Sequence, residues 1–185
     1  MVNSEREKML AHELYRGADP ELVAMRRQTQ EKLYRFNHAR PAELEVRQEV
    51  VRSLFHTIGP NFEITPPFFC DYGDHIRAGK NLYLNTNCTI LDCNWVTLGD
   101  DVMLAPNVQI YTAYHPVDPA VRLSGLEMAA PIMIGSNVWL GGGVIVCPGV
   151  TIGDNTTIGA GSVVTKSIPA NVVAVGNPCR ILRKV

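Results

Sequence analysis

One histidine of this sequence lies in a segment that breaks an otherwise regular pattern. The run Tyr111-Thr-Ala-Tyr-His115-Pro116 opens a stretch, residues 111–131, that interrupts a six-residue repeat. An imidazole titrates near neutral pH, so a loop histidine can accept a proton from a reacting group. His115 could instead be a loop histidine bonded to a backbone carbonyl. Its place in the long insertion favours the general-base role, because loops on rigid frames often carry function.

A run of three glycines provides a second group that could take part in chemistry. Gly141-Gly142-Gly143 would leave backbone amides open to a ligand, and a fixed N–H can donate to the oxyanion of a tetrahedral intermediate. Trp139 lies two residues before this run, and strand alternation predicts that its ring points outward. So apolar a ring at the surface indicates that a ligand or a neighbouring subunit covers it.

Two polar residues stand at positions where the pattern makes them informative. Asn85 occupies a slot in which six other repeats have glycine, so a side chain that donates and accepts hydrogen bonds replaces a corner residue. It could equally be a turn asparagine in the left-handed region. Glu127, near the end of the insertion, could orient an imidazole, bind a substrate, or remain a solvated loop carboxylate.

A six-residue repeat carries these residues from about residue 75 onward. An aliphatic position recurs every six residues, and a second apolar position precedes it by two. Residues two apart on a strand face the same side, so each hexad predicts a short strand with an inward pair. Three hexads would close one triangular coil, and stacked coils of this kind indicate a parallel β-helix. The first series is Ala78, Leu84, Ile90, Leu98, Leu104, Ile110, Ile134, Leu140, Val146, Ile152, Ile158 and Val164, and the second is Ile76, Leu82, Cys88, Val96, Val102, Val108, Ile132, Val138, Val144 and Val150.

Glycines and irregular steps mark the corners of the predicted coils. Glycine follows the aliphatic residue in six hexads, where we expect it to adopt the positive φ of a corner. The step from Ile90 to Leu98 has two residues more than a hexad, and the step from Ile110 to Ile134 has eighteen more. The glycines are Gly79, Gly99, Gly135, Gly141, Gly153 and Gly159.

The N-terminal third of the chain contains residues that typically begin and end helices. Ser4 and Glu7 have the spacing of a capping box, and Asp19-Pro20 places a cap residue before a first-turn proline. Pro41 opens a further helical segment, and prolines at 60, 66 and 67 end regular structure. The sequence therefore predicts a mainly β protein, with an N-terminal α-helical cap at 1–58. A β-helix at 59–185 follows, with the inserted loop 111–131 and a C-terminal tail.

Composition narrows the choice of partners. With 17 Lys+Arg against 18 Asp+Glu the formal charge is −1, which disfavours nucleic acid or an acidic membrane surface as a partner. The first ten residues lack the apolar core of a secretory signal, and no stretch approaches the roughly 20 apolar residues that span a bilayer. We expect a cytoplasmic protein with no bound metal. The five cysteines form no CxxC pair, so we expect reduced core residues.

A long composite pattern is formed by the segments Asp71-Tyr72-Gly73, Asn85, TAYHP at 112–116, Gly125-Leu126-Glu127, PIMIGSNVWLGGG at 131–143, VTIGDNTTIGAGSVVTKSIP at 150–169 and VGNPCR at 175–180. This pattern resembles the maltose and galactoside O-acetyltransferase family, which includes the nodulation acetyltransferases. The resemblance covers nearly the whole chain. It implies a left-handed β-helix, a homotrimer, and acetyl-CoA sites between subunits. It also implies direct transfer of acetyl from acetyl-CoA to a hydroxyl of a maltose-, glucose- or galactoside-like sugar.

The resemblance also assigns roles to individual residues. It makes His115 the general base and the Gly142 amide the oxyanion donor, with Asn85 and Glu127 acting beside the histidine. Asp71, which could also be a turn cap, would join Asn85 and Glu127 in binding the acceptor. The residues that the resemblance assigns to acetyl-CoA are Trp139, Gly142, Ala160, Thr165, Lys166, Arg180 and Arg183.

Three alternatives stay open. The cations near the C-terminus could be ordinary surface, and a β-helix could serve as a non-catalytic scaffold or as a zinc-dependent hydratase, although His75 and His115 form no recognisable ligand cluster. The acceptor could be an amine or an antibiotic instead of a sugar. Some relatives place an acceptor carboxylate in the N-terminal cap, whereas this chain reads Tyr15-Arg16-Gly17-Ala18-Asp19, in which Asp19 is better explained as a helix cap.

Overall fold

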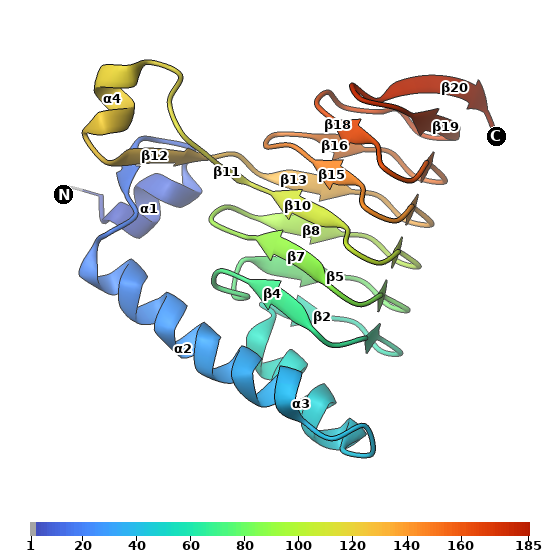
Figure 1. Ribbon diagram of the computed structural model, residues 1–185, viewed down its shortest axis with the longest axis horizontal. Coiled ribbons are helices and arrows are strands. Elements are labelled where there is room, and N and C mark those ends of the chain that lie inside the picture. The colour runs from blue at the N-terminus through green and yellow to red at the C-terminus, as the bar shows by residue number, and fades with distance from the viewer. Residues whose placement is uncertain (1–2) are drawn as a thin grey trace.

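Short parallel strands wind into three faces around one core. The computed structural model describes residues 3–185, and Figure 1 shows the coils stacked between the N-terminal helices and the C-terminal hairpin. The first face contains β2 (Thr57–Ile58), β5 (Ile76–Ala78), β8 (Val96–Leu98), β13 (Ile132–Ile134) and β16 (Thr151–Ile152). The second contains β3 (Glu63–Ile64), β6 (Tyr83–Leu84), β9 (Met103–Leu104), β14 (Trp139–Leu140), β17 (Thr157–Ile158), β19 (Val172–Val175) and β20 (Arg180–Lys184). The third contains β4 (Phe68–Cys70), β7 (Cys88–Leu91), β10 (Gln109–Tyr111), β15 (Ile145–Val146) and β18 (Val163–Val164).

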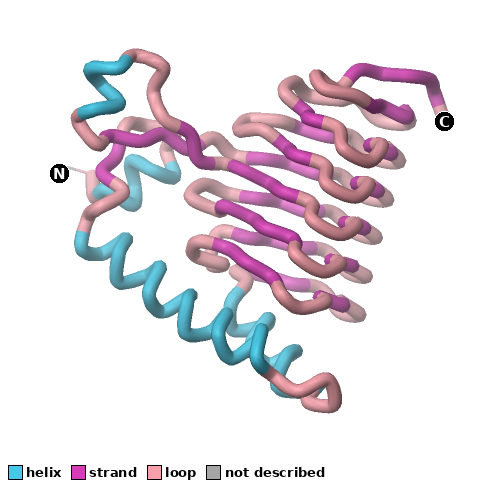
Figure 2. Tube along the Cα trace, in the orientation of Figure 1, coloured by secondary structure: helices cyan, strands magenta, loops and turns pink. Residues whose placement is uncertain are grey.

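Each coil visits the faces in the same order, so three columns of corners run along the protein (Figure 2). The first corner, between the first and second faces, comprises residues 59–62, 79–82, 99–102, 135–138 and 153–156. The second corner, between the second and third faces, comprises residues 65–67, 85–87, 105–108, 141–144 and 159–162. The third corner leads back to the first face and comprises residues 71–75, 92–95, 112–131, 147–150 and 165–167.

The inward residues are the two apolar series of the repeat. Every residue of both series is buried, so the predicted alternation of strand residues is confirmed. The parallel register aligns equivalent positions of successive coils: Leu98 pairs with Ala78 on one side and with Ile134 on the other. The hexad therefore builds a continuous core because each inward pair stacks on the pair of the next coil.

The corner glycines serve a different purpose from the one expected. None of the six glycines after the aliphatic positions has a positive φ. A Cβ on Gly153 would lie 2.4 Å from the Ala170 amide nitrogen, and one on Gly141 would lie 2.6 Å from the Ala160 nitrogen. Glycine is required because the backbone of the next coil fills the space of a side chain. The left-handed corner residues stand two places later and include Asn81, Asn87, Asp101, Asn107, Asn137, Gly143, Asn155 and Gly161.

The N-terminal helices close one end of the core. The expected capping box joins Ser4 and Glu7, and the Asp19 side chain accepts from the Glu21 amide at the start of the second helix. Leu33 and Leu54 belong to the same apolar cluster as the coil residues. No helix among residues 3–185 is long and apolar enough to cross a membrane. The helices are α1 (Glu5–Leu10), α2 (Pro20–His38) and α3 (Leu44–Leu54), after which β2 already pairs with β5.

The insertion forms a small antiparallel sheet beside the coils. It contains β11 (Ala113–Tyr114), α4 (Pro119–Leu123) and β12 (Leu126–Ala129), and β12 pairs with both β11 and β1 (Tyr15–Arg16). In Figure 1 this sheet lies above α1, at the side of the coils away from the C-terminus. At the C-terminal end of the β-helix, the exposed strand β20 pairs antiparallel with β19, whose Val172 and Ala174 are buried.

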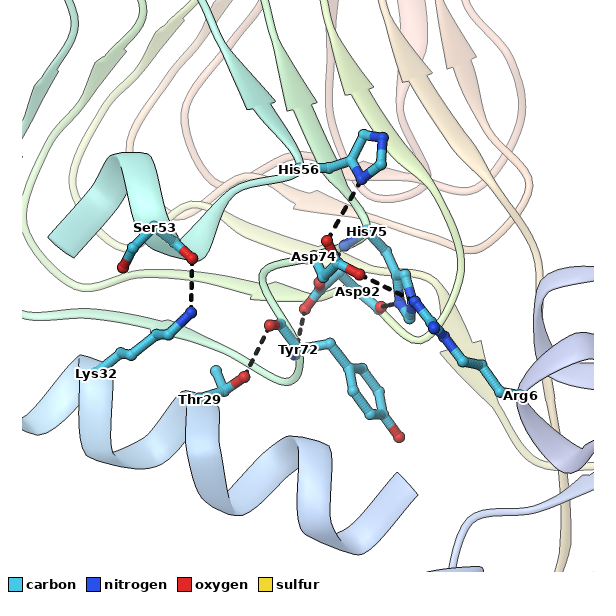
Figure 3. Close-up of polar contacts among 9 residues, drawn as sticks. All are labelled: Arg6, Thr29, Lys32, Ser53, His56, Tyr72, Asp74, His75 and Asp92. Atoms are coloured by element: carbon cyan, nitrogen blue, oxygen red, sulfur yellow. Dashed lines mark hydrogen bonds and ion pairs between the residues drawn. The ribbon is translucent and has the colours of Figure 1, made fainter. Parts of the chain in front are cut away.

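Asp92, which lies in the next coil, holds the loop 71–75 of the third corner in place. Its Oδ1 accepts from the Asp71 amide at 3.0 Å. The same oxygen accepts from the Tyr72 amide at 2.9 Å, and the Asp92 backbone oxygen contacts His75 Nδ1 at 2.8 Å (Figure 3). Thr29 of α2 donates to the Tyr72 carbonyl at 2.7 Å from the other side. Asp92 is fully buried, and burial raises the pKa of its carboxyl to about 7 although the backbone amides oppose this shift.

The close approach of coils predicts that alanine substitution at two adjacent glycines will have different effects on stability. Gly141→Ala should lower the free energy of unfolding by about 1–3 kcal/mol, because its Cβ would overlap the backbone of residue 160. Gly142→Ala should change it by less than about 0.5 kcal/mol, because the nearest atom to its Cβ would be the Pro106 oxygen at 3.5 Å. Urea denaturation at matched protein concentration measures the free energy of unfolding of both variants. Equal losses in the two variants would contradict this explanation of the glycines.

Burial of Asp92 predicts a specific pH dependence of stability. Its folded pKa of about 7 lies above the unfolded value of about 3.9, so the folded state favours the protonated form. The stability contributed by this group is full below about pH 4 and is lost as the pH rises through about 7. Asp92→Asn keeps an Oδ1 acceptor for the loop amides and should remove this component. Unfolding free energies at pH 5 to 8 should decline less in the variant than in the wild type; parallel curves would refute the assignment.

Candidate active site

Two of the expected acceptor-binding residues meet in one pocket at the third corner. The pocket has a volume of about 260 Å³ and contains both Asp71 and Glu127. Asp71 comes from the loop after β4, whereas Glu127 comes from β12 of the insertion. The other lining residues are Gly17, Arg26, Cys93 and Ala113.

The carboxylates of this pocket are fixed by neighbouring side chains. Tyr15 donates its hydroxyl to Glu127 Oε2 at 3.2 Å, and the Cys93 thiol donates to Asp71 Oδ2 at 3.4 Å. Burial raises the pKa of Asp71, and it also raises the pKa of the Cys93 thiol. A thiol kept protonated in this way is a poor nucleophile, so the pocket offers carboxylate acceptors and no thiolate.

His115 stands two residues after Ala113, which lines the pocket. It follows β11 directly and is exposed. The register of β11 and β12 pairs Ala113 with Ala129 and Tyr114 with Met128, and β11 ends there. An extension of this register by one residue would place His115 opposite Glu127. Directly opposed residues of an antiparallel pair present their side chains on the same side. Within residues 3–185, no hydrogen bond joins the His115 imidazole to another group.

Asn85 and Gly142 lie at the second corner, on another edge of the prism. Asn85 has no positive φ, so it is not the left-handed turn asparagine that its slot allows; its Oδ1 accepts from the Thr86 amide at 2.7 Å. At the position equivalent to Gly142 in two other coils, Pro66 and Pro106 have no amide hydrogen to donate. The hydrogen bonds of the described chain include none donated by the Gly142 or Ala160 amides. These two amides are therefore open to a ligand.

The remaining residues expected to bind acetyl-CoA extend from this corner toward the C-terminus. Trp139 points outward from the second face and is 49% exposed, beside Met103 in the register. Thr165 and Lys166 are exposed at the third corner of the last coil, and Arg180 and Arg183 are exposed on β20.

The structure thus divides the expected site into two groups. His115, Glu127 and Asp71 share the third corner, whereas Asn85, Gly142 and Ala160 share the second. The two groups come from different edges of a three-sided prism, so one chain does not bring them together.

Several pocket residues were not predicted as site residues from sequence. Cys93 was expected only as a core residue, and it is indeed nearly buried, yet it also lines the pocket. A signal for it existed: the two extra residues between Ile90 and Leu98 belong to the corner 92–95, where Asp92 and Cys93 stand. Tyr15 and Arg26 carried no such signal, because their roles depend on how α2 and β1 pack against the coils.

Comparison with known proteins identifies relatives over the whole chain. The model of the maltose acetyltransferase hexapeptide capping motif matches residues 8–59, and that of the bacterial transferase hexapeptide matches residues 131–166. The galactoside O-acetyltransferase of Escherichia coli is 45% identical over 153 residues, which cover 83% of this chain and 75% of that protein.

Solved structures agree in fold and length. A maltose O-acetyltransferase from Clostridium difficile has a TM-score of 0.99 at 49% identity, covering 100% of this chain and 99% of that one. A galactoside acetyltransferase in complex with coenzyme A has a TM-score of 0.96 at 44% identity, covering 99% of this chain and 92% of that one. The protein therefore has the left-handed parallel β-helix of hexapeptide acetyltransferases. By sequence and by fold, the chain belongs to the maltose and galactoside O-acetyltransferase family.

Proposed function

We propose that this protein transfers acetyl from acetyl-CoA to a hydroxyl of a sugar, with no covalent acetyl-enzyme. The observation that carries the proposal is the acidic pocket of Asp71 and Glu127, with the exposed His115 two residues beyond its lining residue Ala113, in a chain of this family. The pocket supplies hydrogen-bond acceptors suited to a polyol, and the nearby imidazole can serve as its base. The raised pKa of the Cys93 thiol disfavours a thioester route.

His115 takes the proton of the acceptor hydroxyl as its oxygen attacks the thioester carbonyl. Glu127, which an extension of the strand register would place opposite His115, orients the imidazole and binds the acceptor together with Asp71 and Asn85. The Gly142 amide donates to the oxyanion of the tetrahedral intermediate. When that intermediate collapses, the CoA sulfur leaves and His115 returns the proton to it.

The donor would bind along the second corner and the end of the β-helix. The unpaired Ala160 amide and the outward Trp139 ring suit the amide-rich pantetheine arm. Thr165, Lys166, Arg180 and Arg183 are exposed near the last coil, where cations can bind phosphates through charge-assisted hydrogen bonds.

A homotrimer accounts for the division of the site between two corners. Around a threefold axis the third corner of each chain would face the second corner of the next, which joins His115 of one chain to Gly142 of its neighbour. Such an assembly would form three equivalent sites and would cover the exposed Trp139 and Met103.

The proposed function predicts acetyl-CoA-dependent thiol release with a sugar acceptor. A panel of glucosides, galactosides, maltose, amino sugars and aminoglycosides should give turnover with at least one neutral sugar. His115→Ala should lower turnover by about 10²- to 10⁴-fold with an almost unchanged KM for acetyl-CoA, because a base acts in the chemical step. His38→Ala is the matched control and should retain full turnover, since the exposed His38 hydrogen-bonds to the Tyr34 carbonyl and stacks on the Tyr34 ring, both on α2. Full activity of His115→Ala, or turnover with aminoglycosides alone, would refute the proposal.

Shared sites predict that two inactive variants restore each other. His115→Ala lacks the third-corner group and Asn85→Ala lacks a second-corner group, so each homotrimer should have low activity. Refolding the two variants together at equal amounts should produce intact sites at about one quarter of positions, by random pairing of neighbours in a closed ring. Sedimentation of every sample should give the mass of a trimer. If the refolded mixture is no more active than either variant, each site lies within one chain.

A further inference from the structure

Gly17 stands where any side chain would collide with a carboxylate of the acceptor pocket. A Cβ on Gly17 would lie 2.8 Å from Glu127 Oε2, 2.9 Å from Oε1 and 2.9 Å from the carboxyl carbon. All three atoms belong to the group that bears the charge. The missing side chain at position 17 therefore creates the space that the Glu127 carboxylate fills.

The backbone at Gly17 is held too firmly to move aside. Arg26 of α2 donates to the Gly17 carbonyl at 2.7 Å. The residues just before it form β1, in which Tyr15 pairs with Glu127 and Arg16 pairs with Leu126. The Asp19 amide then donates to the Arg16 carbonyl at 3.1 Å in the turn that starts α2. Gly17 is also buried, so an added methyl group would have to displace the Glu127 side chain.

The two carboxylates that face the pocket are free to bind a ligand, whereas the one guanidinium is already hydrogen-bonded. The Arg26 guanidinium donates hydrogen bonds to the Tyr72 hydroxyl at 2.5 Å and to the Gly17 carbonyl. Asp71 and Glu127 each receive one neutral hydrogen bond, from Cys93 and Tyr15, and keep further lone pairs. Two carboxylates and one already engaged guanidinium favour hydroxyl donors and disfavour an anion.

We propose that Gly17 is a specificity-determining residue: by leaving room for the Glu127 carboxylate, it gives the pocket a pair of carboxylates that selects uncharged polyols and rejects anionic sugars. This inference rests on the proposed function, because it concerns the acceptor of the same reaction. Gly17 itself touches no reacting atom and acts through the position of Glu127.

A double-mutant cycle tests the link between the two residues. Gly17→Ala and Glu127→Ala should each lower kcat/KM for a neutral sugar acceptor by about tenfold or more, because a hydrogen bond to a charged group is lost. In the Glu127→Ala background, Gly17→Ala should cost less than about twofold, since no carboxylate remains to be displaced. The KM for acetyl-CoA and the midpoint of thermal unfolding report whether each variant keeps its fold.

A matched pair of acceptors tests the selection by charge. The wild type should strongly prefer methyl glucoside to glucose 1-phosphate, which differ in charge at one position. Glu127→Gln keeps the size of the side chain and removes one negative charge, so the preference should shrink by about tenfold. Gly17→Ala should also reduce the preference by moving the carboxylate. A crystal structure of Gly17→Ala should show Glu127 turned away from its wild-type position.

The outcomes separate this inference from the proposed function. If the wild type acetylates no neutral polyol, the proposed function fails and the inference fails with it. If the wild type does so but Gly17→Ala is equally active, only the inference is overturned. Equal losses from Gly17→Ala with and without Glu127 would also overturn it, because Gly17 would then act through the backbone. An unchanged preference for the neutral glucoside in Glu127→Gln would overturn the selection by charge.

Discussion

The close approach of successive coils is the constraint on which the rest of this structure depends. Parallel strands of neighbouring coils hydrogen-bond along three faces, and at the corners the backbones come so near that a Cβ has no space at several positions. This spacing makes the coil a rigid unit whose inward residues stack in columns. It also dictates where the chain can vary, because an extra residue in a strand would break the register on both sides.

Extra residues are therefore confined to corners, and the third corner contains most of them. The loop 71–75, the corner 92–95 and the insertion 112–131 lie one above another in the same column. The buried Asp92 joins two of these levels through the Asp71 and Tyr72 amides, as Figure 3 shows for Tyr72. β12 of the insertion then brings Glu127 over the level of Asp71. A pocket arises at this corner because irregular segments surround it while the strands beneath stay regular.

The two corners make different chemical contributions. The second corner is nearly all backbone: small residues and prolines leave the Gly142 and Ala160 amides exposed as fixed dipoles. The third corner provides side chains that titrate or accept hydrogen bonds, and the N-terminal segment completes it with Tyr15, Gly17 and Arg26. Separating a rigid donor surface from a variable acceptor pocket would let acceptor choice change with little effect on donor binding.

The sequence by itself determined the β-helix, its inward residues and the position of the insertion, because a six-residue period can satisfy only one kind of coil. It also pointed to His115, since a histidine inside a break in so strict a repeat is conspicuous. The glycines were located correctly but explained wrongly, because the distance between coils is a tertiary quantity and the left-handed residues stand two places later. Only the tertiary structure decided that Asp71 and Glu127 share a pocket, that Tyr15 and Arg26 support it, and that Asn85 lies on another edge. Those relations join residues up to 112 positions apart, as in the Tyr15 to Glu127 hydrogen bond, and no local period encodes how separate segments pack.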